Sequence, residues 1–222
     1  RCLGARATAD GAQVACTADV IVLAVKPQQM ASVVADLAPC ITRRQLVVSI
    51  AAGMTLRWLQ ARLPGIPLVR VMPNLPATVQ QGFAAYARGR RASTRHRQIT
   101  EAIFGAAGEV VEVPERWLDA VTAVSGSGPA YVFFLAQVWE EAARTLGLPP
   151  AIAARAVRQT LEGSTRLLQM SDEPALALIK KVASKGGTTE AALKVLARRK
   201  VAAHFVEALR AATRRSKQLS VS

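Results

Sequence analysis

Several residue types are scarce in this 222-residue sequence, and each scarcity excludes a class of protein. The three cysteines, Cys2, Cys16 and Cys40, are odd in number and form no C-x-x-C motif, so we expect free thiols in a reducing cytosol. The two histidines, His96 and His204, lack partners at ligand spacing, so no metal site is predicted.

Long apolar runs are also absent. No uncharged apolar run reaches the ~18 residues that a bilayer crossing requires. The opening residues RCLGARATADG contain neither an apolar signal region nor a small-residue cleavage site. We therefore expect a cytoplasmic protein with no membrane association.

Acidic residues are too few to balance the basic ones, and the formal net charge is +14. The excess is spread, because residues 1–120 carry 14 basic and 8 acidic side chains, and residues 121–222 carry 15 and 7. Only the segments 88–97 and 214–217 are dense, and neither has interleaved aromatic residues. This pattern favours a solvated basic surface over a nucleic-acid partner.

The first half alternates short apolar strands with helical stretches. Strands are predicted at 19–25, 46–50, 68–72, 82–88 and 109–113, and helices at 28–38, 55–63 and near 93–106. Such alternation predicts a parallel sheet with crossover helices. From about residue 115 the pattern is helical only, with helices at 130–147, 150–170 and 201–219. We predict an α/β domain over 1–120 and an all-helical domain over 121–222.

Three motifs follow the predicted strands at their carboxyl ends, where open α/β sheets bind ligands. They are AVKPQ (24–28), SIAAG (49–53) and VMPNLP (71–76). Small residues around Ala52 allow a flat ligand to approach the backbone, Lys26 offers a cation for a phosphate, and Asn74 offers an amide. Each motif alone also fits an ordinary loop, but three at one sheet edge favour a binding site.

The helical half contains two glycine-rich helix starts. AVSGSGPAYVFF (123–134) places Pro129 in a first turn with Ser127 as the cap, and GGTT (186–189) precedes another apolar run. Free N–H groups at a helix start bind anions, and the hydroxyls of Thr188 and Thr189 add donors. Simple capping is the alternative. We favour a site for a small carboxylate.

These motifs, with KGGTTEAALKVL (185–196), resemble pyrroline-5-carboxylate reductase in order and separation from about residue 10 to 219. The resemblance implies a dinucleotide-binding domain followed by a helical domain that interleaves into a homodimer, often assembled into a decamer. It implies reduction of 1-pyrroline-5-carboxylate to L-proline with NADPH or NADH.

The resemblance also implies roles for individual residues. The N–H groups of Gly187 and Thr188 would hold the substrate carboxylate, Ser184 would line that pocket, and Thr189 would donate a proton to the ring nitrogen. On the nucleotide side, Ala24, Val25, Lys26 and Pro27 would cover the cofactor. Ala52 would lie near the nicotinamide, and Asn74 near the junction with the substrate.

The sequence departs from the family pattern at several positions. The glycine-rich G-x-G-x-x-G turn is not found upstream of residue 19, so we expect an incomplete Rossmann-like sheet domain. Without that segment the sequence does not distinguish NADPH from NADH. Lys185 replaces the family's proline beside the carboxylate site, and Leu75 replaces a threonine.

Two other functions remain open. A non-enzymatic relic would retain the helical dimerisation domain without binding the cofactor, in agreement with the absent glycine loop. A related imine or β-hydroxyacid reductase would share the two-domain plan. Dehydrogenases of that second kind carry a lysine and an asparagine on the inter-domain helix, and AYVFFLAQVWEEAARTLG (130–147) has neither.

Overall fold

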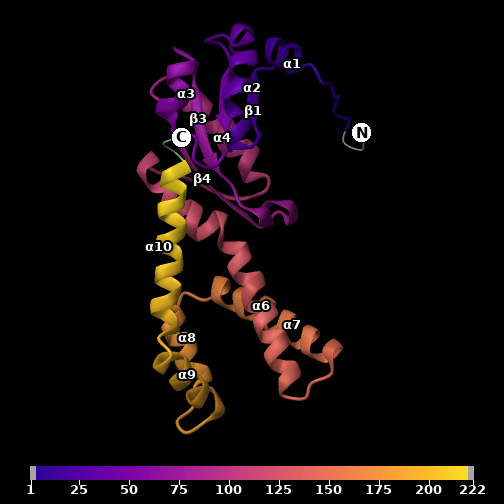
Figure 1. Cartoon of the computed structure of the whole chain (residues 1–222), viewed down its shortest axis with the longest axis vertical. Coiled ribbons are helices and arrows are strands. Elements are labelled where there is room, and N and C mark those ends of the chain that lie inside the picture. The colour runs from indigo at the N-terminus through magenta and orange to yellow at the C-terminus, as the bar shows by residue number, and fades with distance from the viewer. Residues whose placement is uncertain (1–3, 220–222) are drawn as a thin grey trace. The chain divides into compact units, whose positions relative to one another are not determined.

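The computed structural model describes residues 4–219, which form two compact units (Figure 1). Unit 1 comprises the residues up to Pro129 together with those from Arg210 onward, and unit 2 comprises Ala130–Leu209. The predicted ranges of 1–120 and 121–222 differ from this division in two ways. The border lies after Pro129, and the last part of the C-terminal helix belongs to unit 1.

Unit 1 is built on a five-stranded mixed sheet in the order β1-β2-β3-β4-β5. The strands are β1 (Val20–Leu23), β2 (Leu46–Ser49), β3 (Leu68–Met72), β4 (Gly82–Arg88) and β5 (Gly108–Glu112). All five strands were predicted, and three of the four neighbouring pairs are parallel. The expectation of an entirely parallel sheet was wrong, because β4 runs antiparallel to β3. Residues 73–81 between them are too few for a crossover helix, so the chain turns back.

Helices cover both faces of this sheet, because apolar residues alternate along its strands. One face packs against α2 (Met30–Leu37), α3 (Leu56–Arg62) and α5 (Leu118–Val121), and the other against α4 (Thr94–Gly105). A helix that was not predicted, α1 (Gly11–Thr17), precedes β1, and the Asp10 side chain accepts a hydrogen bond from the Gln13 N–H at its start. Short helical turns η1 (Pro27–Gln29), η2 (Ala38–Cys40), η3 (Leu75–Val79) and η4 (Glu115–Trp117) occupy the connections.

A buried arginine connects several elements of unit 1. Arg70 lies in β3 and is only 3% exposed. Its guanidinium lies 3.4 Å from the Glu115 carboxylate and 3.7 Å from that of Asp119. Asp119 also accepts a hydrogen bond of 2.7 Å from Ser216 in α10 (Val201–Leu219). The end of α10 is thus held to β3 by polar contacts.

Tyr86 forms a second buried polar cluster, on the α4 face of the sheet. Its side chain is fully buried, and its hydroxyl donates to Glu101 at 2.7 Å, with Glu112 at 3.3 Å. Burial raises the pKa of Tyr86 above its ordinary range, with the two carboxylates adding to the effect. The neutral phenol therefore fastens α4 to β4 at physiological pH.

Unit 2 is entirely helical, as predicted, and has little core of its own. It contains most of α6 (Gly128–Thr145), α7 (Pro150–Met170), α8 (Ala175–Val182), α9 (Thr188–Arg198) and the first part of α10. Tyr131 and Phe205 join α6 to α10 in an edge-to-face contact with ring centroids 5.8 Å apart. Its only buried apolar residues among those described are Ala143, Ala153 and Val157.

Large apolar side chains of α6 are exposed instead, including Phe133 at 59% and Phe134 at 66%. Within residues 4–219, one helical run, Glu115–Thr145, is long and apolar enough to cross a membrane by length and composition alone. Apolar surface of this extent on a helix indicates an interaction surface.

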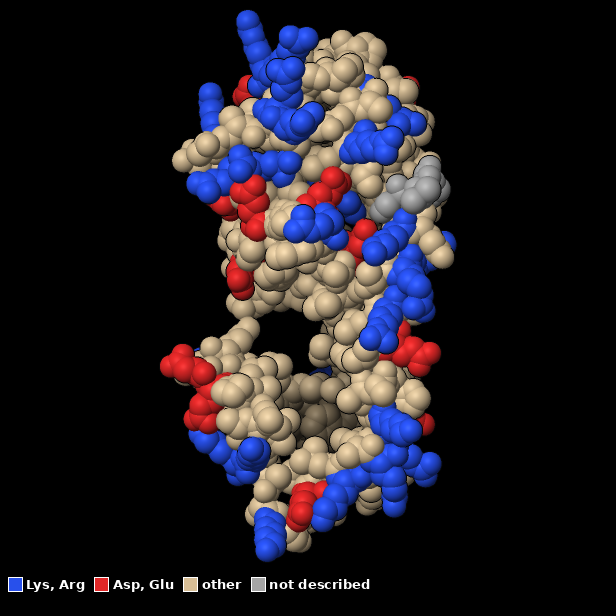
Figure 2. Space-filling view, turned by 90° about the vertical axis from the view of Figure 1, so that its left-hand side faces the viewer, with Lys and Arg blue, Asp and Glu red and all other residues tan. Residues whose placement is uncertain are grey.

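Basic side chains are not gathered into one stripe. Figure 2 shows Lys and Arg in several separate groups over one face, with Asp and Glu between some of them. This distribution agrees with the spread of charge along the sequence.

Candidate active site

The three predicted motifs lie at one edge of the unit 1 sheet. Leu23 at the end of β1 pairs with Ser49 at the end of β2, and Ser49 pairs with Arg70 near the end of β3. Because these strands are parallel, the loops that follow them leave the sheet on the same side. The structure therefore brings Ala24–Pro27, Ala52 and Asn74 to a common carboxyl edge.

This edge offers small side chains and a cation. Ala24 and Lys26 are exposed, while Val25, Pro27 and Ala52 are partly buried. Within residues 4–219, no carboxylate pairs with the Lys26 ammonium. An ammonium beside loops with small side chains, such as Ala24 and Ala52, suits an anionic ligand such as a phosphate.

Gly53 ends the second motif in a backbone conformation that favours glycine, with φ +80°. A Cβ placed there would lie 2.8 Å from the Cβ of Leu219, at the end of α10. A side chain at position 53 would therefore strain the backbone and also overlap with Leu219. The last turn of α10 lies directly against this loop.

Asn74 has a structural role at the edge. Its side-chain oxygen accepts from the Phe83 N–H at 2.9 Å, and its amide donates to the Ser125 hydroxyl at 3.1 Å. Asn74 thus joins the loop after β3 to β4 and to the segment that leads into α6. One amide hydrogen remains for a ligand.

A helix does begin in the segment SGSG, because α6 starts at Gly128 with Pro129 in its first turn, but the residues before it are helical as well. Residues Thr122–Gly126 (η5) form a π-helical turn between α5 and α6, in which the Ser127 N–H donates to the Thr122 oxygen at 2.8 Å. The wider turn accommodates Pro129, which has no N–H to donate. A Cβ on Gly126 would lie 2.4 Å from Met72 Cε, so this glycine permits close packing on β3.

The GGTT segment does begin a helix, α9, in unit 2. Gly187 is the N-cap, and no side chain of the described residues caps this start. The Gly187 N–H donates to the Ser184 oxygen at 3.0 Å, so this group is already used, contrary to the prediction. The N–H groups of Thr188 and Thr189 have no acceptor in the described part of the chain.

Glycine at position 187 is a steric requirement. A Cβ there would lie 2.5 Å from the Ser184 hydroxyl oxygen. The chain therefore turns tightly from Ser184 into α9, and Gly186, with φ +75°, makes this turn possible. Ser184 and Thr188 are exposed and Thr189 is partly buried, so all three lie around one helix start.

Charges near this start are mostly positive. Glu190 forms an ion pair of 2.9 Å with Lys194 and accepts a hydrogen bond from the Gly186 N–H. The Lys194 contact, and then the Gly186 bond, lower the pKa of Glu190. Lys185 is exposed, and no carboxylate of residues 4–219 pairs with it. Because the Glu190 carboxylate is paired with Lys194, its negative charge opposes an anion at this helix start only weakly.

Sequence reasoning missed Ser125 and Glu190 as members of these two regions. Ser125 belongs to the first region through its hydrogen bond with Asn74, which is 51 residues away in the sequence, and no local pattern reveals such a contact. Glu190 had a detectable signal, since an acid at the third helical position often reaches back to the preceding backbone. No group of three or more His, Cys, Asp or Glu residues within residues 4–219 is arranged to hold a metal ion.

A sheet whose loops gather at one carboxyl edge, followed by helices, is the arrangement found in dinucleotide-dependent oxidoreductases. Residues 1–53 match the family model described as NADP oxidoreductase, coenzyme F420-dependent. Residues 115–219 match the model described as pyrroline-5-carboxylate reductase dimerisation.

Sequence comparison with known proteins identifies the family within this class of oxidoreductases. The chain is 42% identical over 214 residues to pyrroline-5-carboxylate reductase from Synechocystis, covering 96% of this chain and 80% of that protein. The enzyme from Pseudomonas aeruginosa is 40% identical over 211 residues, covering 94% and 77%. The chain belongs to the pyrroline-5-carboxylate reductase family.

Solved structures agree with this assignment. Pyrroline carboxylate reductase from Plasmodium falciparum with NADP bound superposes with a TM-score of 0.89 at 30% identity, covering 94% of this chain and 79% of that one. The Coxiella burnetii enzyme gives 0.87 at 37% identity, covering 96% and 80%. The fold of unit 1 and the helical second half are those of the family.

Proposed function

We propose that this protein reduces the C=N bond of 1-pyrroline-5-carboxylate with NADPH or NADH, giving L-proline in the last step of proline biosynthesis. The observation that carries this function is the family membership together with the two regions described above. The carboxyl edge suits a dinucleotide, and the start of α9 suits a small carboxylate with a hydroxyl beside it.

The carboxyl edge of unit 1 would hold the cofactor. Ala24, Val25, Lys26 and Pro27 would cover the nucleotide, with the Lys26 ammonium near a phosphate. Ala52 would face the nicotinamide, because an alanine methyl leaves room for a flat ring. The bound cofactor supplies a hydride, and the protein residues orient the two rings.

The start of α9 would hold the substrate. We propose that the N–H groups of Thr188 and Thr189 receive the carboxylate, while Gly187 keeps the turn tight and Ser184 lines it. Negative charge develops on the imine nitrogen during reduction, so a positioned proton source lowers the barrier. The Thr189 hydroxyl, which makes no hydrogen bond with another described residue, is the proposed donor.

Self-association follows from the dimerisation domain that residues 115–219 match. We propose a homodimer, which would assemble further into a decamer, in which exposed apolar residues of α6 meet a second copy. This contact also accounts for the apolar run Glu115–Thr145 without a membrane. The protein would act in the cytoplasm, with no nucleic-acid partner.

The function is tested by following nicotinamide absorbance while 1-pyrroline-5-carboxylate is added to the protein and NADPH or NADH. Oxidation of the cofactor that depends on substrate, with L-proline as product, is expected. The relic alternative predicts no oxidation. A fluorescence titration with each cofactor separates loss of binding from loss of chemistry.

A further inference from the structure

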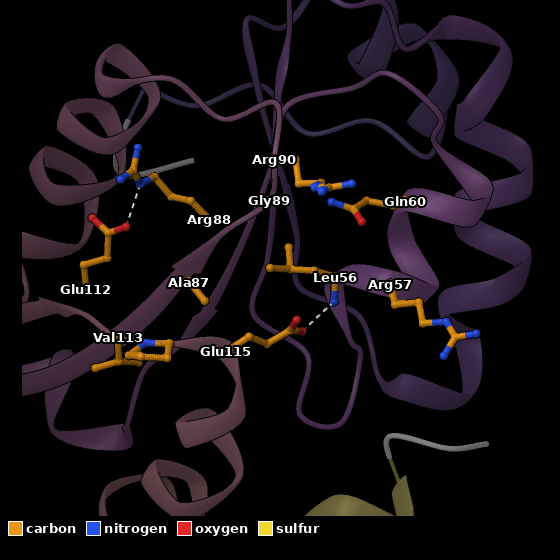
Figure 3. Close-up of a pocket in the computed structure, with 11 residues that line it drawn as sticks. Leu56, Arg57, Gln60, Ala87, Arg88, Gly89, Arg90, Glu112, Val113 and Glu115 are labelled. Atoms are coloured by element: carbon orange, nitrogen blue, oxygen red, sulfur yellow. Dashed lines mark hydrogen bonds and ion pairs between the residues drawn. The ribbon is translucent and has the colours of Figure 1, made fainter.

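A hollow in unit 1 lies away from the carboxyl edge (Figure 3). It has a volume of about 560 Å³ and lies between α3 and the ends of β4 and β5. Because β4 is antiparallel to β3, its last residue, Arg88, pairs with Val69 near the beginning of β3. This end of the sheet is opposite Asn74. The volume falls within the ~300–1,000 Å³ typical of small-molecule sites.

Both acidic residues that line the hollow already have a cationic partner. Glu112 forms an ion pair of 2.7 Å with Arg88. Glu115 accepts from the Leu56 N–H at 2.7 Å and lies 3.4 Å from the buried guanidinium of Arg70. Figure 3 shows the Arg88–Glu112 and Leu56–Glu115 contacts within the lining. Each carboxylate therefore has a cationic partner, although Arg70 also lies 3.7 Å from Asp119.

Two further arginines line the hollow without such a partner. No carboxylate of residues 4–219 pairs with Arg57 or Arg90, and both side chains are exposed. Figure 3 shows Gln60 of α3 and Arg90 of the turn after β4 extending toward each other. Arg57 lies three residues before Gln60 in α3 and also lines the hollow, and in Figure 3 its guanidinium extends away from Gln60 and Arg90.

The turn after β4 is held close to α3. The Gly89 N–H donates to the Leu68 oxygen at 2.8 Å. A Cβ on Gly89 would lie 3.1 Å from the Gln60 amide nitrogen and 3.2 Å from that same oxygen. Glycine at this position therefore lets the turn place Arg90 beside Gln60.

We propose that this hollow is a second binding site, for a small dianion, with Arg57, Gln60 and Arg90 as the groups that contact it. The lining holds three arginines and two glutamates, so its formal charge is +1, and the guanidinium groups of Arg57 and Arg90 are the ones that no carboxylate of residues 4–219 pairs with. A planar guanidinium binds a phosphate or a carboxylate through two parallel N–H bonds, and the Gln60 amide adds a donor. The ligand is a phosphate group or a dicarboxylate. The site is distinct from the proposed reductase site and does not depend on it.

Calorimetric titration tests this site, with inorganic phosphate in one arm and succinate in the other. Sodium chloride holds the ionic strength constant, and saturating NADPH is present so that the cofactor site is filled. We expect saturable binding of one dianion per chain in at least one arm. The arm that binds more tightly identifies the phosphate or the dicarboxylate class.

Arg57→Gln and Arg90→Gln should each weaken this binding by about tenfold or more, because each removes a charge-assisted hydrogen bond. The matched control is Arg91→Gln, since Arg91 is exposed in the same turn but does not line the hollow. It should bind as the wild type does. Unchanged melting temperatures without ligand show that the variants fold.

Absence of saturable binding in both arms would overturn the proposal. So would an equal loss of affinity in Arg91→Gln, which would indicate general attraction by the basic surface. The titration is repeated without NADPH, and binding seen only in its absence would place the anion at the cofactor edge and overturn the proposal.

Discussion

Thr189 lies in the first turn of α9, partly buried, with a hydroxyl that neither caps the helix nor bonds to another described residue. A proton donor used mainly as charge develops should affect kcat more than KM. We expect Thr189→Ala to lower kcat by ~10²-fold or more, with a small change in KM. Steady-state kinetics with both cofactors measures the two effects.

Thr189→Ser is the control, because it retains the hydroxyl and should retain most of kcat. Since Gly187 is the N-cap, Thr189→Ala should leave the melting temperature nearly unchanged. A Thr189→Ala enzyme with near-normal kcat would exclude the proton-donor role and leave this start as a carboxylate site only.

Lys185 should behave differently, because its exposed ammonium would attract the carboxylate of a substrate bound as proposed, in ground and transition states alike. We expect Lys185→Gln to raise KM a few-fold with kcat preserved, since an exposed charge pair contributes about 0.2–1 kcal/mol. Added salt should reduce the difference from the wild type. Lys180→Gln, an equally exposed lysine in α8, is the control and should leave KM unchanged.

At the scale of secondary-structure elements, the buried ion pairs of Arg70 with Glu115 and Asp119 should contribute strongly to the stability of unit 1. Replacing Arg70 by methionine leaves Glu115 and Asp119 without their buried cation and weakens the hold on α10. We expect Arg70→Met to lower the free energy of unfolding by about 3 kcal/mol. Chemical denaturation measures this change.

Arg88→Met is the matched control, because its ion pair with Glu112 is about one-third exposed on both sides. Partly exposed pairs contribute little, so the loss should be about 1 kcal/mol or less. Equal losses in the two variants would mean that burial does not govern the Arg70 contacts.

The elements also show how far sequence reasoning reached. All five strands were predictable because short, mostly apolar segments between turn residues specify strands, most clearly in the continuous apolar runs of β1 and β2. The common edge of Ala24–Pro27, Ala52 and Asn74 followed from the parallel strands. The antiparallel β4 was missed, although the short connection from Met72 to Gly82 was a usable signal.

Other features depend on tertiary contacts and could not be read locally. The π-helical turn at Thr122–Gly126 depends on Gly126 packing against Met72 and on the Asn74–Ser125 bond. The partner of the Gly187 N–H is likewise set by the turn from Ser184. The helix start at GGTT was predicted correctly, but the sequence did not reveal that the Gly187 N–H is already bonded to the Ser184 oxygen.

At the scale of the whole molecule, the helical unit buries too little apolar surface to stand alone. We expect a dimer in solution through helices within 125–170 and 186–219, which light scattering at micromolar concentration measures. Phe134→Glu should shift the dimer toward monomer, because a charge would enter an apolar contact. Leu176→Glu, at a similarly exposed position on α8, should remain dimeric. A wild-type protein that is monomeric at this concentration would contradict the proposed dimer.

The reduction itself is tested most directly by the fate of the transferred hydrogen. NADPH carrying deuterium at the transferred position of its nicotinamide is supplied with 1-pyrroline-5-carboxylate, and the product is examined by mass spectrometry and NMR. Direct hydride transfer predicts L-proline with one deuterium on the ring carbon that formed the C=N bond. Absence of L-proline, or L-proline without deuterium at that carbon, would contradict the proposed function.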